Sequence, residues 1–446
     1  MSYKDLLPGL VSIVSAARRW ISNARSVEES TLEDRAAFLN PEIRTGVVLL
    51  WLSGTLFAQQ ARPSEVPQNE VAQNQLQRDQ ATAAQKKSHL PRNSPAKKFY
   101  DTPVPLPAGK PGDLIRSAPL PYSLGVQAVR ILYYSRSGNG DLVAASGVVL
   151  FPAGKPPAGG WPVIAWAHSL SGVARVCAPS LARKLLPVSF LSMYVNLGYA
   201  VVATDYAGLG TSFRNAFADV RANTSDVIYS IPAARSAVPG LGPRWIAMGT
   251  GEGAMAVVGV AEMEYQAPDP SYLGGVAISR VTDLEDLLAP TGNQPHELPL
   301  LLAYGLKTAY PQFDASDVLT EQALPLYERL GEECGVSGVD KMPVTDMLKA
   351  HWEGNRFVQD YFRRNRLGMG PANGPLLVIG SEGEPSIIAT TKVVARLCQQ
   401  GDWVLFNRYA EYDPGRVIGD SVRDQMAWIQ ERFANRPART NCSLQH

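Results

Sequence analysis

The sequence predicts an α/β fold: a mostly parallel, twisted sheet flanked by helices, with an inserted helical cap. Three observations support this prediction. Short apolar runs of strand length alternate with segments of helix length from about residue 163 onward. One run, 245–248, leads through a glycine-dense turn straight into a helix-like segment. A long insertion, about 280–370, precedes the last two strand-like runs, and we expect it to form the cap.

The composition is that of a soluble globular protein, with 446 residues of which 45% are hydrophobic and 19% charged. The formal net charge is +1. A charge so close to zero produces no field that would attract nucleic acid or an anionic membrane surface, so we expect neither as a partner.

The chain divides into three parts. Residues 1–61 form an N-terminal extension, whose apolar run 46–58 has the length of a signal peptide and is too short for a stable membrane span. Residues 62–100 are rich in Gln and poor in large apolar side chains, which predicts a disordered linker. Residues 101–446 form the folded domain. The long stretch before the apolar run leaves three alternatives: a later translation start, an atypical signal or anchor, or a buried core helix.

The chain has four cysteines. An even number behind a signal-like run predicts two disulfides and an exported protein, either secreted, periplasmic or on the cell surface. Four reduced core thiols are the alternative if the run is not a signal. No pair has the Cys-x-x-Cys spacing of a metal or redox site, and we expect neither a metal nor a cofactor.

The domain begins with a proline-rich segment, 102–121, which suits an extended strap on the surface. The runs 129–134 and 144–151 then predict an antiparallel pair around the turn residues 138–141. The later runs are continuously apolar, as in strands covered on both faces: 163–167, 199–203, 245–248, 275–278, 376–379 and 403–406. Helix-length segments lie between several of them: 225–237, 252–265, 389–400 and 420–433. Within the insertion 316–330 is helix-like, and an ordinary helical excursion is the alternative to a lid.

The turn at 249–253 has the spacing of a nucleophile elbow, Gly-x-Ser-x-Gly. In that motif a sharp strand-to-helix turn presents a serine oxygen above the sheet, close to backbone N–H groups. Gly249 and Gly253 occupy the outer positions, and Gly251 stands where the serine would be. The turn therefore predicts the architecture of an elbow without its nucleophile.

Three segments resemble the secretory lipase family of α/β-hydrolases, which contains the fungal lipase A type and bacterial exported lipases. Val163–Ser180 is similar to the family's strand, oxyanion loop and Cys-Ala-Pro-Ser segment, and Asn196–Gly210 to its next strand and turn. The tail, 397–442, also matches. The resemblance covers 114–442 and implies an α/β-hydrolase fold. In that family a serine attacks a carboxylic ester, a histidine accepts its proton, and an aspartate orients the histidine.

The resemblance places the serine position on Gly251, the acid position on Gly383 and the histidine position on Pro414. A shift of one residue would offer Glu382 or Glu384 as the acid. Gly251 has no nucleophile and Pro414 has no imidazole, so the resemblance implies that the usual triad is lost.

The resemblance also implies how the cysteines pair: Cys177 with Cys334, and Cys398 with Cys442. Each pair would close a long loop and stabilise the fold by ~2–4 kcal/mol.

Histidine is scarce in this chain, which has five: His89, His168, His296, His351 and His446. Beyond the last predicted strand only the terminal His446 remains, and a terminal residue is poorly placed to line a pocket. His168 lies in the oxyanion loop, where the family also has histidine. A structural role for His168 is therefore favoured over that of a general base.

Four side chains are candidates for the mouth of the site: His168, Ser169, Thr250 and Glu252. The loop reads His-Ser-Leu from His168, where the family typically has His-Gly-Thr. Ser169 beside His168 suggests a displaced dyad, although loop hydroxyls usually bond the local backbone. For Glu252, which follows the missing serine, interaction with the helix dipole is the simple interpretation and a new general base the alternative. Thr250 precedes the apex, and its side chain should point away from it.

These patterns predict an exported lipase-like protein that has lost Ser-His-Asp catalysis. It would bind an apolar small molecule, a lipid, an ester or a protein partner. A working ester hydrolase with a relocated nucleophile is the first alternative, and it predicts labelling by a fluorophosphonate. A secreted structural or adhesion module is the second, and it predicts a pocket filled by cap side chains.

Overall fold

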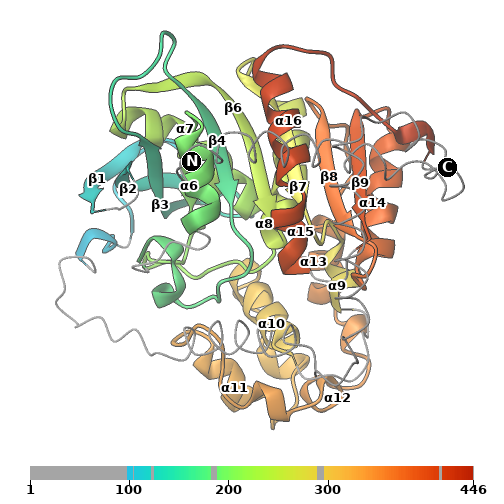
Figure 1. Ribbon diagram of the computed structural model, residues 1–446. Coiled ribbons are helices and arrows are strands. Elements are labelled where there is room, and N and C mark those ends of the chain that lie inside the picture. The colour runs from blue at the N-terminus through green and yellow to red at the C-terminus, as the bar shows by residue number, and fades with distance from the viewer. Residues whose placement is uncertain are drawn as a thin grey trace, which may run out of the picture. The chain divides into compact units, whose positions relative to one another are not determined.

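The computed structural model describes residues 98–103, 105–121, 125–181, 188–288, 296–410 and 414–444. These residues contain a nine-stranded sheet of order β1-β2-β3-β5-β4-β6-β7-β8-β9. The contacts β1–β2, β2–β3 and β3–β5 are antiparallel, and the remaining contacts are parallel. Helices lie on both faces (Figure 1), so the predicted α/β fold is confirmed. The strands are β1 (Leu114–Leu120), β2 (Val126–Arg136), β3 (Leu142–Pro152), β4 (Trp161–Ala167), β5 (Ala200–Thr204), β6 (Leu241–Thr250), β7 (Tyr272–Ile278), β8 (Leu376–Ser381) and β9 (Val404–Tyr409).

The central strands are apolar throughout because both of their faces are covered. In β4, Val163 and Ala165 belong to a core cluster with side chains of α7, α8 and α14. The alternate residues Ile164 and Trp166 belong to a second cluster with α6 and α16 on the opposite face. The helices are α6 (Val188–Asn196), α7 (Val220–Ala237), α8 (Glu252–Gln266), α14 (Ile387–Gln399), α15 (Pro414–Asp420) and α16 (Val422–Phe433).

The start of the domain differs from the prediction in two respects. The proline-rich segment contains a strand, β1, which pairs with β2 at the edge of the sheet, so it is not only a surface strap. Tyr100, assigned from the sequence to the linker, is 1% exposed. Its hydroxyl forms a hydrogen bond of 2.7 Å with the Ser180 hydroxyl, which fixes this end of the segment to the core. The signal-like run and residues 62–97 of the linker lie outside the described residues.

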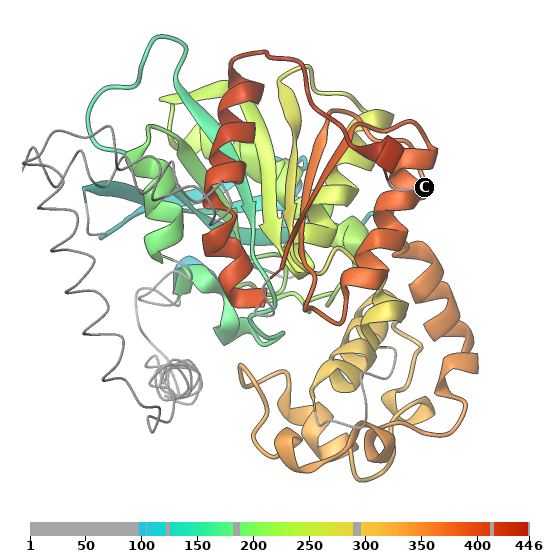
Figure 2. The same cartoon turned by 45° about the vertical axis from the view of Figure 1, so that its right-hand side comes forward.

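The segment between β7 and β8, here called the insertion, lies beyond one end of the sheet (Figures 1 and 2). It has its own apolar core, with Leu301, Phe313 and Met347 fully buried. The predicted helix over 316–330 forms only in its second part, as a short helix over Leu324–Arg329. Before it, Leu319 lies in an isolated β-bridge with Leu348. The helices of the insertion are α9 (Leu284–Leu288), α10 (Leu298–Ala309), α11 (Leu324–Arg329), α12 (Val344–Met347) and α13 (Arg356–Arg364).

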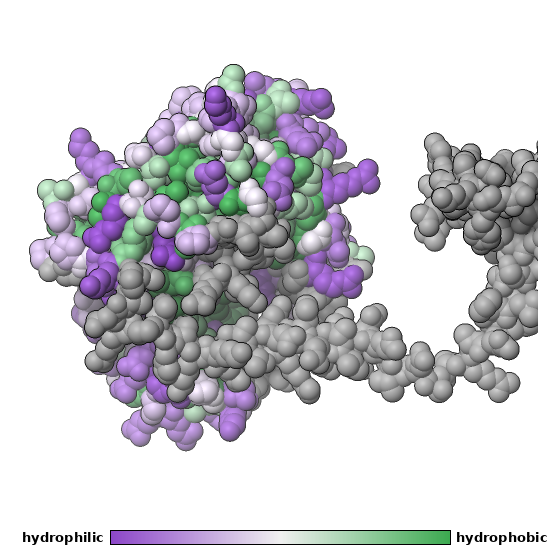
Figure 3. Space-filling model, turned by 60° about the vertical axis from the view of Figure 1, so that its left-hand side comes forward, coloured by the Kyte–Doolittle hydropathy of each residue, from purple (hydrophilic) through white to green (hydrophobic). Residues whose placement is uncertain are grey.

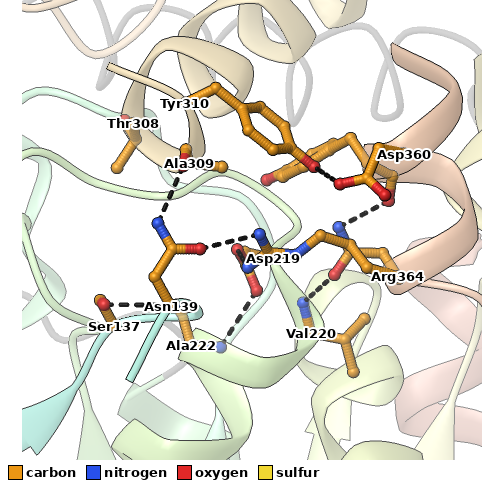
Figure 4. Close-up of polar contacts among 12 residues, drawn as sticks. Ser137, Asn139, Asp219, Val220, Ala222, Thr308, Ala309, Tyr310, Asp360 and Arg364 are labelled. Carbon is orange, nitrogen blue, oxygen red and sulfur yellow. Dashed lines mark hydrogen bonds and ion pairs between the residues drawn. The ribbon is translucent and has the colours of Figure 1, made fainter. Parts of the chain in front are cut away.

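A buried ion pair joins the insertion to the core (Figure 4). Arg364, at the end of α13, lies 2.8 Å from a carboxylate oxygen of Asp219, the N-cap residue of α7. The two side chains are only 12% and 1% exposed. Arg364 also donates to the Asn139 side chain (2.9 Å), whose amide donates to the Ala309 carbonyl (2.8 Å). We call Asn139, Asp219 and Arg364 the polar joint.

Two disulfides fasten peripheral segments, with the pairing that the family resemblance implies. Cys177–Cys334 links the loop after β4 to the insertion, and Cys398–Cys442 links the end of α14 to the tail. The Asn441 side chain accepts from the Phe406 N–H (2.8 Å) and donates to its carbonyl (2.9 Å). The tail thus covers part of the open side of β9, which would otherwise be an unpaired sheet edge.

Hydrophobic and hydrophilic side chains are mixed on the face of the molecule in Figure 3. Within the described ranges, no helix combines the length and the apolar composition needed to cross a membrane.

Candidate functional site

The turn after β6 has the backbone conformation of an elbow. Gly251 has φ 56° and ψ −119°, which would cost on the order of 1–3 kcal/mol for a residue with a Cβ. Its N–H lies 3.2 Å from the Ile278 carbonyl, and its own carbonyl accepts from the Ala254 N–H at 2.9 Å. The first hydrogen bonds of α8 therefore begin at Gly251. Glycine relieves the strain of the apex while the turn itself is kept.

The two outer glycines allow the turn to pack against the loop after β4. A Cβ at Gly253 would lie 2.0 Å from the Ala167 carbonyl oxygen, and one at Gly249 would lie 2.4 Å from the Gly253 carbonyl oxygen. Both neighbours are backbone atoms, which cannot rotate away. The turn and the loop that carries His168 and Ser169 are therefore held at a fixed, short separation.

Ser169 brings a hydroxyl to the apex. A Cβ built on Gly251 would lie 2.5 Å from Ser169 Oγ and 3.3 Å from Ser169 Cβ. Ser169 is exposed, and its hydroxyl makes no hydrogen bond to any residue that the structure describes. The space that an elbow serine would need is thus next to a free hydroxyl from another loop.

His168 is held by the backbone around it and does not face that hydroxyl. The residue is 6% exposed. Its Nδ1 lies 2.5 Å from the Ser169 carbonyl oxygen and its Nε2 lies 3.2 Å from the Asp205 carbonyl oxygen. Its ring packs on Tyr206 at 4.4 Å between centroids, and the Tyr206 hydroxyl donates to the His168 carbonyl at 2.8 Å. These contacts support the structural role and bring His168 and Ser169 together without forming a dyad.

Glu252 directs its carboxylate toward the start of α7. Its Oε1 accepts from the Ala218 N–H at 2.8 Å and from the Asn223 side chain at 2.9 Å. Burial raises the pKa of this carboxyl, and the two hydrogen bonds and nearby His168 oppose that rise. Ala218 has φ 53°, a strained value that the bond to Glu252 helps to hold. Thr250, the other candidate on this turn, is the last residue of β6 and is 5% exposed.

The acid position contains a carboxylate with other partners. Gly383 lies in the turn after β8, with Glu382 exposed on one side of it and Glu384 buried on the other. Glu384 accepts from the Ser279 hydroxyl (3.0 and 3.2 Å) and from Arg280 Nε (3.1 Å). The Glu384 carboxylate is therefore paired with the Arg280 guanidinium, a partner that the sequence does not predict.

Ser279 and Arg280 follow β7 and have φ values of 59° and 53°. Two consecutive non-glycine residues with positive φ store strain. Their contacts with Glu384 hold them in place, and the Ser279 carbonyl lies 3.3 Å from the Gly251 N–H. This pair of residues therefore supports the elbow from the neighbouring strand.

The histidine position lies at the start of α15. Pro414 is its first residue, and residues 411–413 lie outside the described part of the chain. Among the other histidines, His296 is half-buried, and burial lowers its pKa. Its Nδ1 has no hydrogen-bond partner within the part of the chain that the structure describes. His351 is exposed at the end of a turn in the insertion. His89 and His446 are not among the described residues.

A cavity of about 310 Å³ lies away from the elbow, among Ala372, Gly374, Pro375, Gly401, Asp402, Trp403, Pro437 and Ala438. Pro375 and Trp403 directly precede the parallel strands β8 and β9, whereas Gly251 directly follows β6. The cavity therefore lies where the parallel strands begin, and the elbow lies where they end. Among the described residues, no group of His, Cys, Asp or Glu side chains could hold a metal ion.

Known proteins resemble this chain in sequence or in fold. A model of the secretory lipase family matches residues 186–441, more than half of the chain. The structure resembles Candida antarctica lipase A, with a TM-score of 0.66 and 15% identity over 78% of this chain and 89% of that one. It also resembles LipA of Xanthomonas oryzae, a rice cell wall degrading esterase, with a TM-score of 0.58 and 16% identity over 73% and 99% of the two chains. No curated protein sequence matches the chain.

Proposed function

The chain belongs to the secretory lipase family, and from this premise we propose that it binds an apolar ester or lipid at the elbow without hydrolysing it. The single observation that carries the proposal is Gly251. It occupies the apex of an intact elbow and supplies no oxygen to attack a carbonyl carbon.

The surroundings of Gly251 support loss of catalysis rather than its takeover by a nucleophile at another position. A serine nucleophile needs a base within hydrogen-bond reach of its hydroxyl. Both ring nitrogens of His168 lie against carbonyl oxygens, and the Glu384 carboxylate is paired with Arg280. Removing a triad typically lowers kcat by about 10⁶-fold, which leaves binding and backbone donors to act alone. Binding without turnover is what these residues support.

A second candidate function is an ester hydrolase with Ser169 as its nucleophile. It is favoured by the position of the Ser169 hydroxyl, 2.5 Å from where a Cβ of residue 251 would be. This candidate requires the His168 ring or another base to turn toward Ser169. It predicts ester cleavage that depends on Ser169.

Membership of the secretory lipase family and the two disulfides together suggest an extracellular or secreted protein. We propose that it acts outside the cytoplasm, in the medium, the periplasm or at the cell surface. Apolar esters are the ligand class that the family suggests, and a protein partner is compatible with the same site.

The test compares hydrolysis of p-nitrophenyl butyrate and p-nitrophenyl octanoate by the wild type, Ser169→Ala and His168→Ala. The proposal predicts that all three proteins match the buffer rate, while methyl octanoate still binds and displaces a fluorescent probe. Enzyme-like turnover by the wild type that is abolished in either variant would establish the second candidate instead.

A further inference from the structure

We infer that the cavity where the parallel strands begin binds a quaternary ammonium group, next to the indole of Trp403 and the carboxylate of Asp402. The group belongs either to a free compound of the choline type or to the headgroup of a choline lipid. This inference does not depend on the proposed function, because the cavity and the elbow lie at opposite ends of the parallel strands.

The walls of the cavity are held in place by contacts with the rest of the fold. The Trp403 carbonyl accepts from the Leu376 N–H at 2.8 Å, which fixes Trp403 beside the start of β8. Asp402 is fixed to the segment before β8, because its Oδ1 accepts from the Ala372 N–H at 2.9 Å. The tail, which forms another wall, is attached to the end of α14 by the Cys398–Cys442 disulfide. The cavity of about 310 Å³ is therefore formed before a ligand arrives, so that little ordering opposes binding.

Asp402 is the one charged side chain among the residues that line the cavity. The Ala372 N–H meets its Oδ1, whereas its Oδ2 is buried and has no hydrogen-bond partner among the described residues. Burial raises the pKa of this carboxyl, and the bond from Ala372 opposes that rise. A second carboxylate is close by, because the charge of Asp402 contributes to the raised pKa of Glu262. A cation in the cavity would supply the charge that these carboxylates lack.

Two arginines flank the wall formed by the tail, and their charges must be weighed against those carboxylates. Arg439 is paired with Glu431 at 3.5 Å. Arg436 is exposed, so that solvent and salt screen its charge. A partly buried carboxylate is screened less than an exposed guanidinium. Asp402 therefore determines the sign of the field inside the cavity, and this field favours a cation.

Trp403 and the shortage of acceptors indicate which kind of cation fits. Trp403 is 55% exposed, so its indole is accessible, and an indole face attracts cations. A primary ammonium has three N–H groups that need acceptors, but one oxygen of Asp402 is already bonded and the other is buried. A quaternary ammonium has no N–H to satisfy. Its methyl groups also suit the apolar side chains of the lining, such as Pro375 and Pro437.

The experiment compares choline with 3,3-dimethyl-1-butanol, in which carbon replaces the charged nitrogen and the shape is kept. Each compound gives one sharp methyl line, so its dissociation constant is measured by ligand-observed NMR titration of the wild type, Trp403→Leu and Asp402→Asn. Leucine keeps an apolar surface, and asparagine keeps an oxygen for the Ala372 N–H. Glu353→Gln, at an exposed position in the insertion, is the matched control for the loss of one negative charge. Thermal melts of the same samples check that each variant is folded.

The wild type should bind choline more tightly than the alcohol. The loss of a cation–π contact or of an ion pair predicts that Trp403→Leu and Asp402→Asn each bind choline about 2- to 5-fold more weakly. Their affinity for the alcohol, and both affinities of Glu353→Gln, should stay at the wild-type level. Equal affinities of the wild type for the two compounds, no binding of choline, or an unchanged preference for choline in both cavity variants would overturn the inference.

Sedimentation with vesicles of dioleoylphosphatidylcholine then identifies the source of the group. Retention of the wild type that is lost in Trp403→Leu indicates a lipid headgroup, whereas choline binding without such retention indicates a free compound. Ester or lipid binding at the elbow is measured separately with methyl octanoate. The inference can therefore fail while the proposed function stands, and the reverse is equally possible.

Discussion

Replacing Arg364 by Met should weaken the attachment of the insertion to the core, because the buried Asp219 carboxylate would lose its cation. The substitution keeps an apolar stem of similar length and removes the guanidinium. Burial raises the pKa of Asp219, and Arg364 opposes that rise. Without Arg364 the carboxyl must either stay charged and unpaired or take up a proton, and both cost stability.

The magnitude follows from the geometry of the pair. The charged atoms are 2.8 Å apart and the side chains are 12% and 1% exposed. Removing one partner of a buried ion pair typically costs about 3–5 kcal/mol. The matched control is Arg363→Met, on the same helix, where the arginine is 75% exposed and pairs with Asp360 at the surface. We expect a change of less than about 1 kcal/mol there.

The assay is urea unfolding of both variants, combined with amide hydrogen exchange at the first turn of α7, which Asp219 caps. Arg364→Met should lower the free energy of unfolding and speed exchange in that turn, whereas Arg363→Met should do neither. Equal losses in the two variants, or a loss below about 1 kcal/mol in Arg364→Met, would refute the polar joint as the attachment of the insertion.

Three further predictions concern stability. Burial raises the pKa of Asp226 to about 7, so this group favours the folded state most below about pH 4, and that contribution is lost as the pH rises to about 7. Asp226→Asn should therefore reduce the change of the urea midpoint with pH between pH 4 and pH 7. The same pH dependence in the wild type and the variant would contradict this. Replacing Cys398 and Cys442 together by Ser removes the disulfide between residues 44 positions apart. The free energy of unfolding in chemical denaturation should fall by about 4 kcal/mol. A loss below about 1 kcal/mol would show that the tail is held without the disulfide. Gly253→Ala would place a Cβ 2.0 Å from a backbone oxygen and should cost about 3 kcal/mol, while Gly419→Ala, with no atom within 4 Å of its Cβ, should be neutral in the same thermal melts.

Much of the fold could be predicted from local sequence, and the failures have physical causes. The run 163–167 predicts a strand because residues that are apolar on both faces can only be buried on both faces. The strand β1 has no such signal in the sequence, because an edge strand needs no continuous apolar run and tolerates Pro119. The segment 316–330 has helical composition but is helical only in α11, because Val318 and Leu319 are buried in the core of the insertion and Leu319 forms a β-bridge with Leu348.

The candidate site was predictable only in part. The glycines at 249, 251 and 253 predict the elbow because the motif is continuous in the sequence. The pairing of Glu384 with Ser279 joins residues 105 positions apart, and no local pattern indicates such a contact. The position of Ser169 beside Gly251 likewise depends on how β4 and β6 align, with Ala167 opposite Gly249. The positive φ values of Ser279 and Arg280 cannot be predicted from the sequence, because neither residue is a glycine.

The most direct test of the central claim is the intact mass of the wild-type protein after incubation with a fluorophosphonate, with Gly251→Ser and Gly251→Ser/Ser169→Gly measured in parallel. The proposed function predicts no added mass on the wild type. It also predicts no rapid labelling of either variant, because a serine at 251 would still lack a histidine partner. A stoichiometric adduct on the wild type, mapped to Ser169 or to any other serine, would contradict the claim that this elbow binds without catalysing.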